Sequence, residues 1–110
     1  MSTRGESARN LFLQGYTCAQ AVVLAFEDMT GLDRATAARL ASGFGGGMGR
    51  MREVCGAVSG GVMVVGMVTG LDTLVPEEKN KLYALEREFA EMFKSKAGSY
   101  ICRELVCVHI

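Results

Sequence analysis

The residues of this 110-residue chain with the clearest capacity for chemistry are its cysteines. There are four: Cys18, Cys55, Cys102 and Cys107. Thiol redox chemistry needs one reactive thiolate and a second cysteine that resolves the first oxidation product. The favoured hypothesis is therefore a small thiol redox protein, with Cys55 as the reactive thiolate and Cys18 or Cys102 as its resolving partner.

Two of the cysteines are predicted at the first turn of a helix. Thr17 and Gln20 have the spacing of a capping box, which makes Cys18 the first helical residue. Cys55 opens an apolar run that carries no charge until after residue 69. Unpaired N–H groups at a helix start carry partial positive charge, which favours thiolate over thiol. The equally weighted alternative for Cys55 is a small buried hydrophobic residue.

A metal site is the second hypothesis, because thiolates are also ligands of zinc and of iron–sulfur clusters. The only closely spaced pair is Cys102 and Cys107, with His109 two residues further on. Structural zinc sites usually draw on tighter Cys-x2-Cys pairs. The metal alternative therefore needs Cys18 and Cys55 as further ligands, and His109 is expected to be exposed.

Glycines are concentrated around Cys55. The segment 43–50 reads GFGGGMGR, and five more glycines follow between residues 56 and 70. Glycine allows close backbone approach and positive φ angles, so the backbone is expected to pass close to another segment here. A nucleotide-binding loop is the weaker interpretation, since no strand is predicted before it and no Gly-Lys-Ser/Thr ending follows. Arg50 and Arg52 remain candidates for holding an anion.

The predicted fold class is all-α: a compact bundle of five or six helices in one domain, residues 1–110. Periodicity and caps predict helices over 6–13, 18–30, 33–42, 55–69 and 76–96, then a short segment over 100–108. Residues 2–5 are expected to be frayed. The glycine-rich helix 55–69 is predicted to be buried at the centre, because it is apolar on all sides. The helices beginning at Cys18 and Pro76 are expected to cover it.

Composition limits the classes of partner. Hydrophobic residues make up 49% of the chain, and 12 basic residues balance 12 acidic ones. This balance argues against a nucleic-acid partner, which would favour a basic excess. The helix 55–69 would be about 22 Å long, too short to span a bilayer.

No signal peptide is visible, so a cytoplasmic location is expected. A redox partner protein and a homodimer are the partners considered, and a non-catalytic interaction protein is the third functional hypothesis.

Four short segments together resemble a known family. They are GYTCAQAV, GFGGGMGR, VCGAVSGG and YICRELVC, and the resemblance extends from residue 11 to about residue 105. The chain is similar to the C_GCAxxG_C_C family of small redox-active proteins. The resemblance implies a redox or metal-binding set formed by Cys18, Cys55, Cys102 and Cys107. It implies a class of chemistry and no particular reaction.

Overall fold

The computed structural model describes residues 3–69 and 74–105. Within these ranges the chain forms six α-helices and two short 3-10 helices. In chain order they are α1 (Arg4–Leu13), α2 (Cys18–Ala25), α3 (Glu27–Thr30), α4 (Arg34–Ala41), η1 (Ser42–Phe44), α5 (Gly56–Thr69), α6 (Pro76–Ala97) and η2 (Cys102–Glu104). The predicted all-α class is confirmed for these residues, whose only extended pairing is an isolated antiparallel bridge between Val54 and Ile101.

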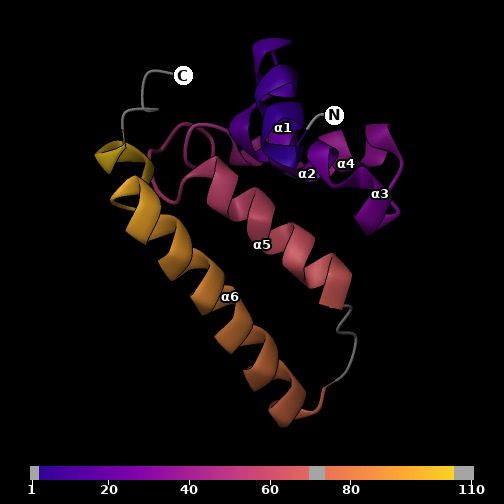
Figure 1. Ribbon diagram of the computed structural model, residues 1–110, viewed down its shortest axis with the longest axis vertical. Coiled ribbons are helices and arrows are strands. Elements are labelled where there is room, and N and C mark those ends of the chain that lie inside the picture. Colours follow the sequence, from indigo (N-terminus) through magenta and orange to yellow (C-terminus); the bar gives the residue numbers. More distant parts are fainter. Residues whose placement is uncertain (1–2, 70–73, 106–110) are drawn as a thin grey trace.

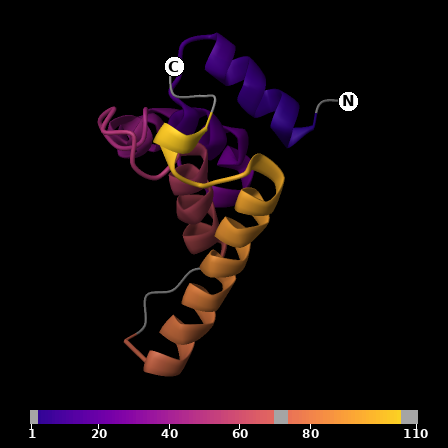
Figure 2. The same cartoon turned by 90° about the vertical axis from the view of Figure 1, so that its left-hand side faces the viewer.

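The helices form a cluster and a hairpin (Figure 1). Helices α1 to α4 gather at one end of the molecule. Helices α5 and α6 lie side by side and antiparallel, and together they extend away from that end. The view in Figure 2 shows the same separation, with η2 returning to the end of the hairpin that adjoins the cluster. The segments that carry the described cysteines therefore meet where the cluster and the hairpin join.

Side-chain caps set the starts of the first helices. The predicted capping box of α2 is confirmed: Thr17 accepts a hydrogen bond from the Gln20 N–H, and Gln20 accepts one from the Thr17 N–H. A second capping box, formed by Thr3 and Glu6, starts α1 at Arg4. The expectation that residues 2–5 fray is therefore wrong for residues 3–5, because both side chains of this box satisfy backbone donors that would otherwise be free.

The second predicted helix, 18–30, is divided in the structure. Helix α2 ends at Ala25, Phe26 leaves helical geometry at φ −112° and ψ 19°, and the short α3 follows. Gly31 then ends α3 with a φ of 75°, in the left-handed conformation that glycine adopts without steric cost. Asp33 caps α4 by accepting the N–H of Thr36, as its position predicts.

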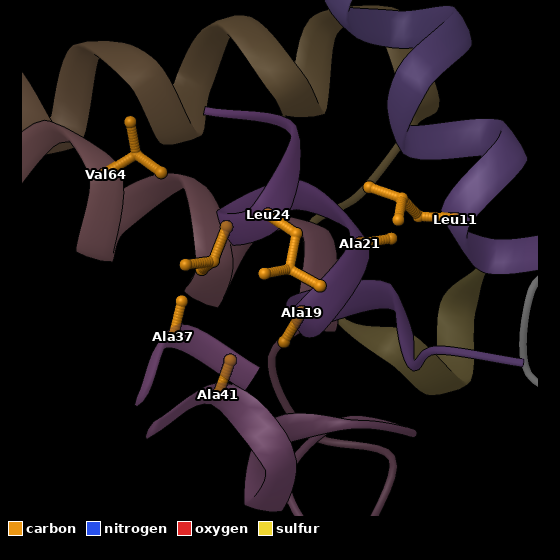
Figure 3. Packing of buried hydrophobic residues seen from close by; sticks show 8 residues of the cluster. Leu11, Ala19, Ala21, Leu24, Ala37, Ala41 and Val64 are labelled. Carbon is orange, nitrogen blue, oxygen red and sulfur yellow. The ribbon is translucent and has the colours of Figure 1, made fainter. Parts of the chain in front are cut away.

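The hydrophobic core is centred on α2, which packs against α1, α4 and α5. Figure 3 shows residues from these four helices pointing toward one another. The core residues are Leu11, Ala19, Ala21, Val23, Leu24, Ala37, Ala41 and Val64. Half of them are alanines, whose small side chains allow the helix axes to approach closely.

The prediction that the glycine-rich helix is buried at the centre is not confirmed. Helix α5 buries one face, which includes three of its glycines, against α2 and α6. Its opposite face and last turn are exposed, at Val62, Met67 and Val68. The sequence pattern could not show this, because a helix that is apolar on all sides gives no indication of which face lacks a neighbour.

Glycines on α5 bring its backbone against both neighbours. A Cβ atom at Gly60 would lie 2.8 Å from the Ala19 carbonyl oxygen, and one at Gly61 would lie 2.2 Å from the Phe89 ring of α6. Cβ atoms are not found at such distances from other atoms. Helix α5 can therefore contact the α2 backbone at Gly60 and the α6 side chain at Gly61 only because these positions have no side chain.

The longest helix, α6, begins and ends as predicted. Pro76 occupies its first turn, and Gly98 ends it at a φ of 98° while donating its N–H to the Lys94 carbonyl over 2.7 Å. Its described side chains are all at least partly exposed, and Phe89 makes its close contact with α5. Across residues 3–69 and 74–105, each helix is too short or too polar to span a membrane.

We predict that Gly60→Ala destabilises the protein by roughly 1–2 kcal/mol, because the new methyl group forces α5 away from the α2 backbone. Gly66→Ala, on the same helix, is the matched control: its Cβ has no neighbour within 4 Å. That substitution should stabilise the helix by about 0.5–1 kcal/mol, because it lowers the entropy lost on folding. Urea unfolding measures both, and equal effects of the two substitutions would contradict the packing account.

Candidate thiol site

Three of the four cysteines lie within the described residues, and each stands at the start of a helix. Cys18 is the first residue of α2, Cys55 directly precedes α5, and Cys102 is the first residue of η2. All three are free thiols. Cys107 and His109 lie outside the described residues.

Backbone hydrogen bonds join the segment before α5 to the segment before η2. The Cys55 N–H donates to the Tyr100 carbonyl over 2.8 Å, and the Cys102 N–H donates to the Glu53 carbonyl. The isolated bridge between Val54 and Ile101 lies between these two bonds. An ion pair of 2.7 Å between Arg103 and Glu53 adds a side-chain link. Cys55 and Cys102, 47 positions apart in sequence, are thereby held in adjoining extended segments.

A glycine places Cys18 beside this pair. A Cβ atom at Gly56 would lie 3.1 Å from the Cys18 Cβ and 3.0 Å from the Ala19 backbone nitrogen. The residue after Cys55 is thus in van der Waals contact with the first turn of α2. Both Cys55 and Cys102 are close enough to act electrostatically on the Cys18 thiol. The structure therefore gathers Cys18, Cys55 and Cys102 into one cluster, here called the thiol cluster.

The loop between η1 and Cys55 follows an unusual left-handed course. Three glycines and three larger residues have φ angles between 59° and 74°. They are Gly46, Gly47, Met48, Gly49, Arg50 and Arg52. Left-handed geometry costs a residue with a side chain roughly 1–2 kcal/mol, and such strain persists only where surrounding contacts enforce it. The glycine-rich segment is therefore a tightly determined turn.

One consequence of this turn is a close contact with the thiol cluster. A Cβ atom at Gly47 would lie 2.7 Å from the Cys102 Cβ and 2.7 Å from the Glu53 nitrogen. The bare Gly47 backbone thus covers Cys102 on one side. On another side, Arg52 Nη1 donates a long hydrogen bond of 4.0 Å to the Cys102 sulfur. From the sequence, Arg52 is a candidate only for holding an anion, because nothing in the spacing relates it to a cysteine 50 positions away.

The three thiols differ in their access to solvent. Cys55 and Cys102 are only 4% and 3% exposed, whereas Cys18 is half-buried. Cys18 also lines an open pocket of about 570 Å³, together with Tyr16, Thr17 and the glycine loop. Cys18 is thus the described thiol that a molecule from solvent reaches first.

Burial raises the pKa of the Cys18 thiol above its ordinary value of 9.0, and the nearby Cys55 and Cys102 raise this pKa further. The expectation that a helix start favours the Cys18 thiolate is therefore wrong. Desolvation and like charges disfavour the anion, and they outweigh the hydrogen bond from the Cys18 N–H that lowers this pKa.

A metal site finds no geometric support in the described part of the chain. No group of three or more His, Cys, Asp or Glu residues between 3 and 69 or between 74 and 105 is arranged to hold a metal ion. The proposed ligands Cys18, Cys55 and Cys102 lie near one another, but the fourth, Cys107, is outside these ranges. Metal binding therefore stays a prediction from the sequence.

Residues 16–109 match the family described as "Putative redox-active protein (C_GCAxxG_C_C)", and this match covers most of the chain. The protein belongs to this family, as its glycine-rich loop and its three cysteine-containing segments suggest. The family description supports a general role in redox chemistry. Neither the curated proteins nor the solved structures include a match to the chain.

We predict that iodoacetamide modifies Cys18 with a pH midpoint above 9.0, since the raised pKa leaves little thiolate at neutral pH. Replacing Cys55 or Cys102 by serine removes an electrostatic effect that raises the Cys18 pKa, so either variant should lower this midpoint. Peptide mapping by mass spectrometry follows the rate at Cys18 alone. A wild-type midpoint below 9.0 would contradict the description of this site.

Proposed function

We propose that the protein is a thiol–disulfide redox protein in which Cys18 reacts first and Cys55 resolves the product. The observation that carries this proposal is the position of one accessible thiol near two buried thiols. The family's general redox role agrees with it. The order differs from the sequence-based expectation, in which Cys55 reacts first, because Cys55 is almost completely covered.

Access supports Cys18 as the first nucleophile. A thiol must approach a disulfide sulfur directly, so its rate depends on its exposure as well as on its pKa. Cys18 opens onto the pocket, whereas an external disulfide cannot approach Cys55 or Cys102 without a movement of the surrounding backbone. The raised pKa slows attack at neutral pH, but a thiolate of high pKa is also the stronger nucleophile once it forms.

Proximity supports Cys55 as the resolving thiol. Of the two buried cysteines, Cys55 has the larger electrostatic effect on Cys18. It also precedes Gly56, whose backbone lies against the Cys18 side chain. Cys102 is the second neighbour, and its sulfur has Arg52 beside it. In this proposal Cys102 is not required for the first disulfide.

The proposed reaction transfers two electrons from the protein to a disulfide. The Cys18 thiolate attacks one sulfur of the external disulfide R–S–S–R, forms a mixed disulfide and releases one RS⁻. The Cys55 thiolate then attacks the Cys18 sulfur and releases the second RS⁻. The two departing thiolates take up the protons lost by Cys18 and Cys55, so the products are an intramolecular disulfide and two RSH. Loss of two crowded thiols, whose anions repel each other, favours this direction.

We predict that mild oxidation of the reduced protein with diamide yields a Cys18–Cys55 disulfide, because these thiols are close and one is accessible. Tryptic peptide mapping by mass spectrometry detects the bond. Cys55→Ser should abolish it, whereas Cys102→Ser is the matched buried control and should retain it. Cys107→Ser should also retain it.

Two outcomes would contradict the proposed function. Thiols that stay reduced in the folded protein at every diamide concentration would exclude the redox pair. Stoichiometric zinc or iron in protein purified without chelator, released only when Cys18 and Cys55 are modified, would favour the metal-binding alternative instead.

A further inference from the structure

We infer that the pocket beside Cys18 binds a low-molecular-weight disulfide that carries a carboxylate, and that Arg50 recognises this negative charge. The inference rests on the proposed function and names the class of its substrate. It is carried by the pocket's shape, by its charge and by the way the glycine loop holds Arg50.

The pocket has the size and composition of a small-molecule site. Its volume of about 570 Å³ lies within the range of roughly 300–1,000 Å³ common for such sites. Phe12 and Tyr16 supply apolar surface, and the glycine loop supplies backbone polar groups. Cys18 is half-buried in its lining, so a disulfide must enter the pocket to reach the sulfur. A narrow, flexible molecule satisfies this requirement more easily than the surface of a folded protein.

Arg50 gives the pocket a positive charge, and none of the residues that line the pocket in the described part of the chain is acidic. It is the only charged residue among those that line the pocket. Within the described residues its guanidinium has no hydrogen-bonded or ion-paired partner, in contrast to those of Arg34 and Arg103, which pair with glutamates. A guanidinium without a partner at the edge of a pocket favours an anion, and a carboxylate matches its planar donors.

The loop holds the Arg50 stem in place although that stem is exposed. Arg50 has a φ of 62°, and its N–H donates to the Gly45 carbonyl over 3.1 Å. A Cβ atom at Gly46 would lie 2.7 Å from the Arg50 Cγ, so the stem folds directly over bare backbone. Gly45 in turn rests on Thr17, since a Cβ there would lie 2.6 Å from the Thr17 Cγ2. Arg50 is thus positioned relative to the residue that precedes Cys18.

In this arrangement Arg50 binds the substrate and Cys18 reacts with it. The carboxylate of the disulfide pairs with Arg50, while its sulfur–sulfur bond faces the Cys18 thiolate. Attack forms the mixed disulfide on Cys18 and releases one carboxylate-bearing thiolate, which takes up a proton. Attack by Cys55 then releases the second, so one small disulfide and two protein thiols become two small thiols and one protein disulfide.

The test compares three disulfides of similar size and different charge. They are 3,3′-dithiodipropionate, which is anionic, bis(2-hydroxyethyl) disulfide, which is neutral, and cystamine, which is cationic. At low ionic strength the wild-type protein should react with the anion about three to ten times faster than with the neutral probe, and slowest with the cation. The rate is followed by mass spectrometry as disulfide formation at Cys18.

Variants identify the source of this preference. Arg50→Gln should make the three rates similar, and Arg50→Glu should reverse their order. Arg50→Lys should keep the order, and Arg87→Gln on α6 is the control for an exposed arginine outside the pocket. Circular dichroism verifies that each variant is folded, and added salt should weaken the wild-type preference without any substitution.

The outcomes separate this inference from the proposed function. If all three probes oxidise Cys18 and Cys55 at equal rates in the wild-type protein, the proposed redox pair is retained. The proposed preference for an anionic substrate is then wrong. If a protein disulfide oxidises the pair while none of the small probes does, the substrate class is again wrong. If no disulfide of any kind reacts at Cys18, the proposed function itself fails.

Discussion

The thiol cluster depends on backbone contacts that only glycine permits. Gly56 lies against the first turn of α2, next to Cys18, and Gly47 lies against Cys102. Gly60 continues the contact between α5 and α2 toward the core. A methyl group at Gly47 or Gly60 would lie within 2.8 Å of a neighbouring atom and force these segments to shift, and one at Gly56 would be in tight contact at 3.0 Å. The cysteines are therefore gathered by the absence of side chains around them, and the alanine-rich core behind them allows the same close spacing.

This construction also explains why the three thiols are unequal. The contacts that bring Cys55 and Cys102 into adjoining extended segments cover both sulfurs almost completely. Cys18 is contributed by a different helix, at the edge of the left-handed loop, and it keeps a path to solvent through the pocket. The strained loop serves both ends of the site, because Gly47 packs on Cys102 while Gly46 supports Arg50. One turn thereby connects the buried thiols to the pocket at the surface.

Much of the local structure could be predicted from the sequence, because caps and glycine stops act over a few residues. The capping box at Thr17, the cap at Asp33 and the limits of α6 are examples. The break at Phe26 has no signal in the local sequence pattern. The exposed face of α5 depends on which segments pack against that helix, which no local pattern encodes. Glycine density indicated a close approach near Cys55. It could not show that Cys18 is the accessible thiol, since access depends on which segments cover each sulfur.

The most direct test of the account is the position of the sulfur atoms in crystals of the reduced protein, located by their anomalous scattering. The account predicts that the sulfurs of Cys18 and Cys55 are in contact, with their Cα atoms within about 7 Å, and that the Cys102 sulfur adjoins them. Separate sulfur positions, each enclosed by apolar side chains and beyond reach of the others, would contradict it.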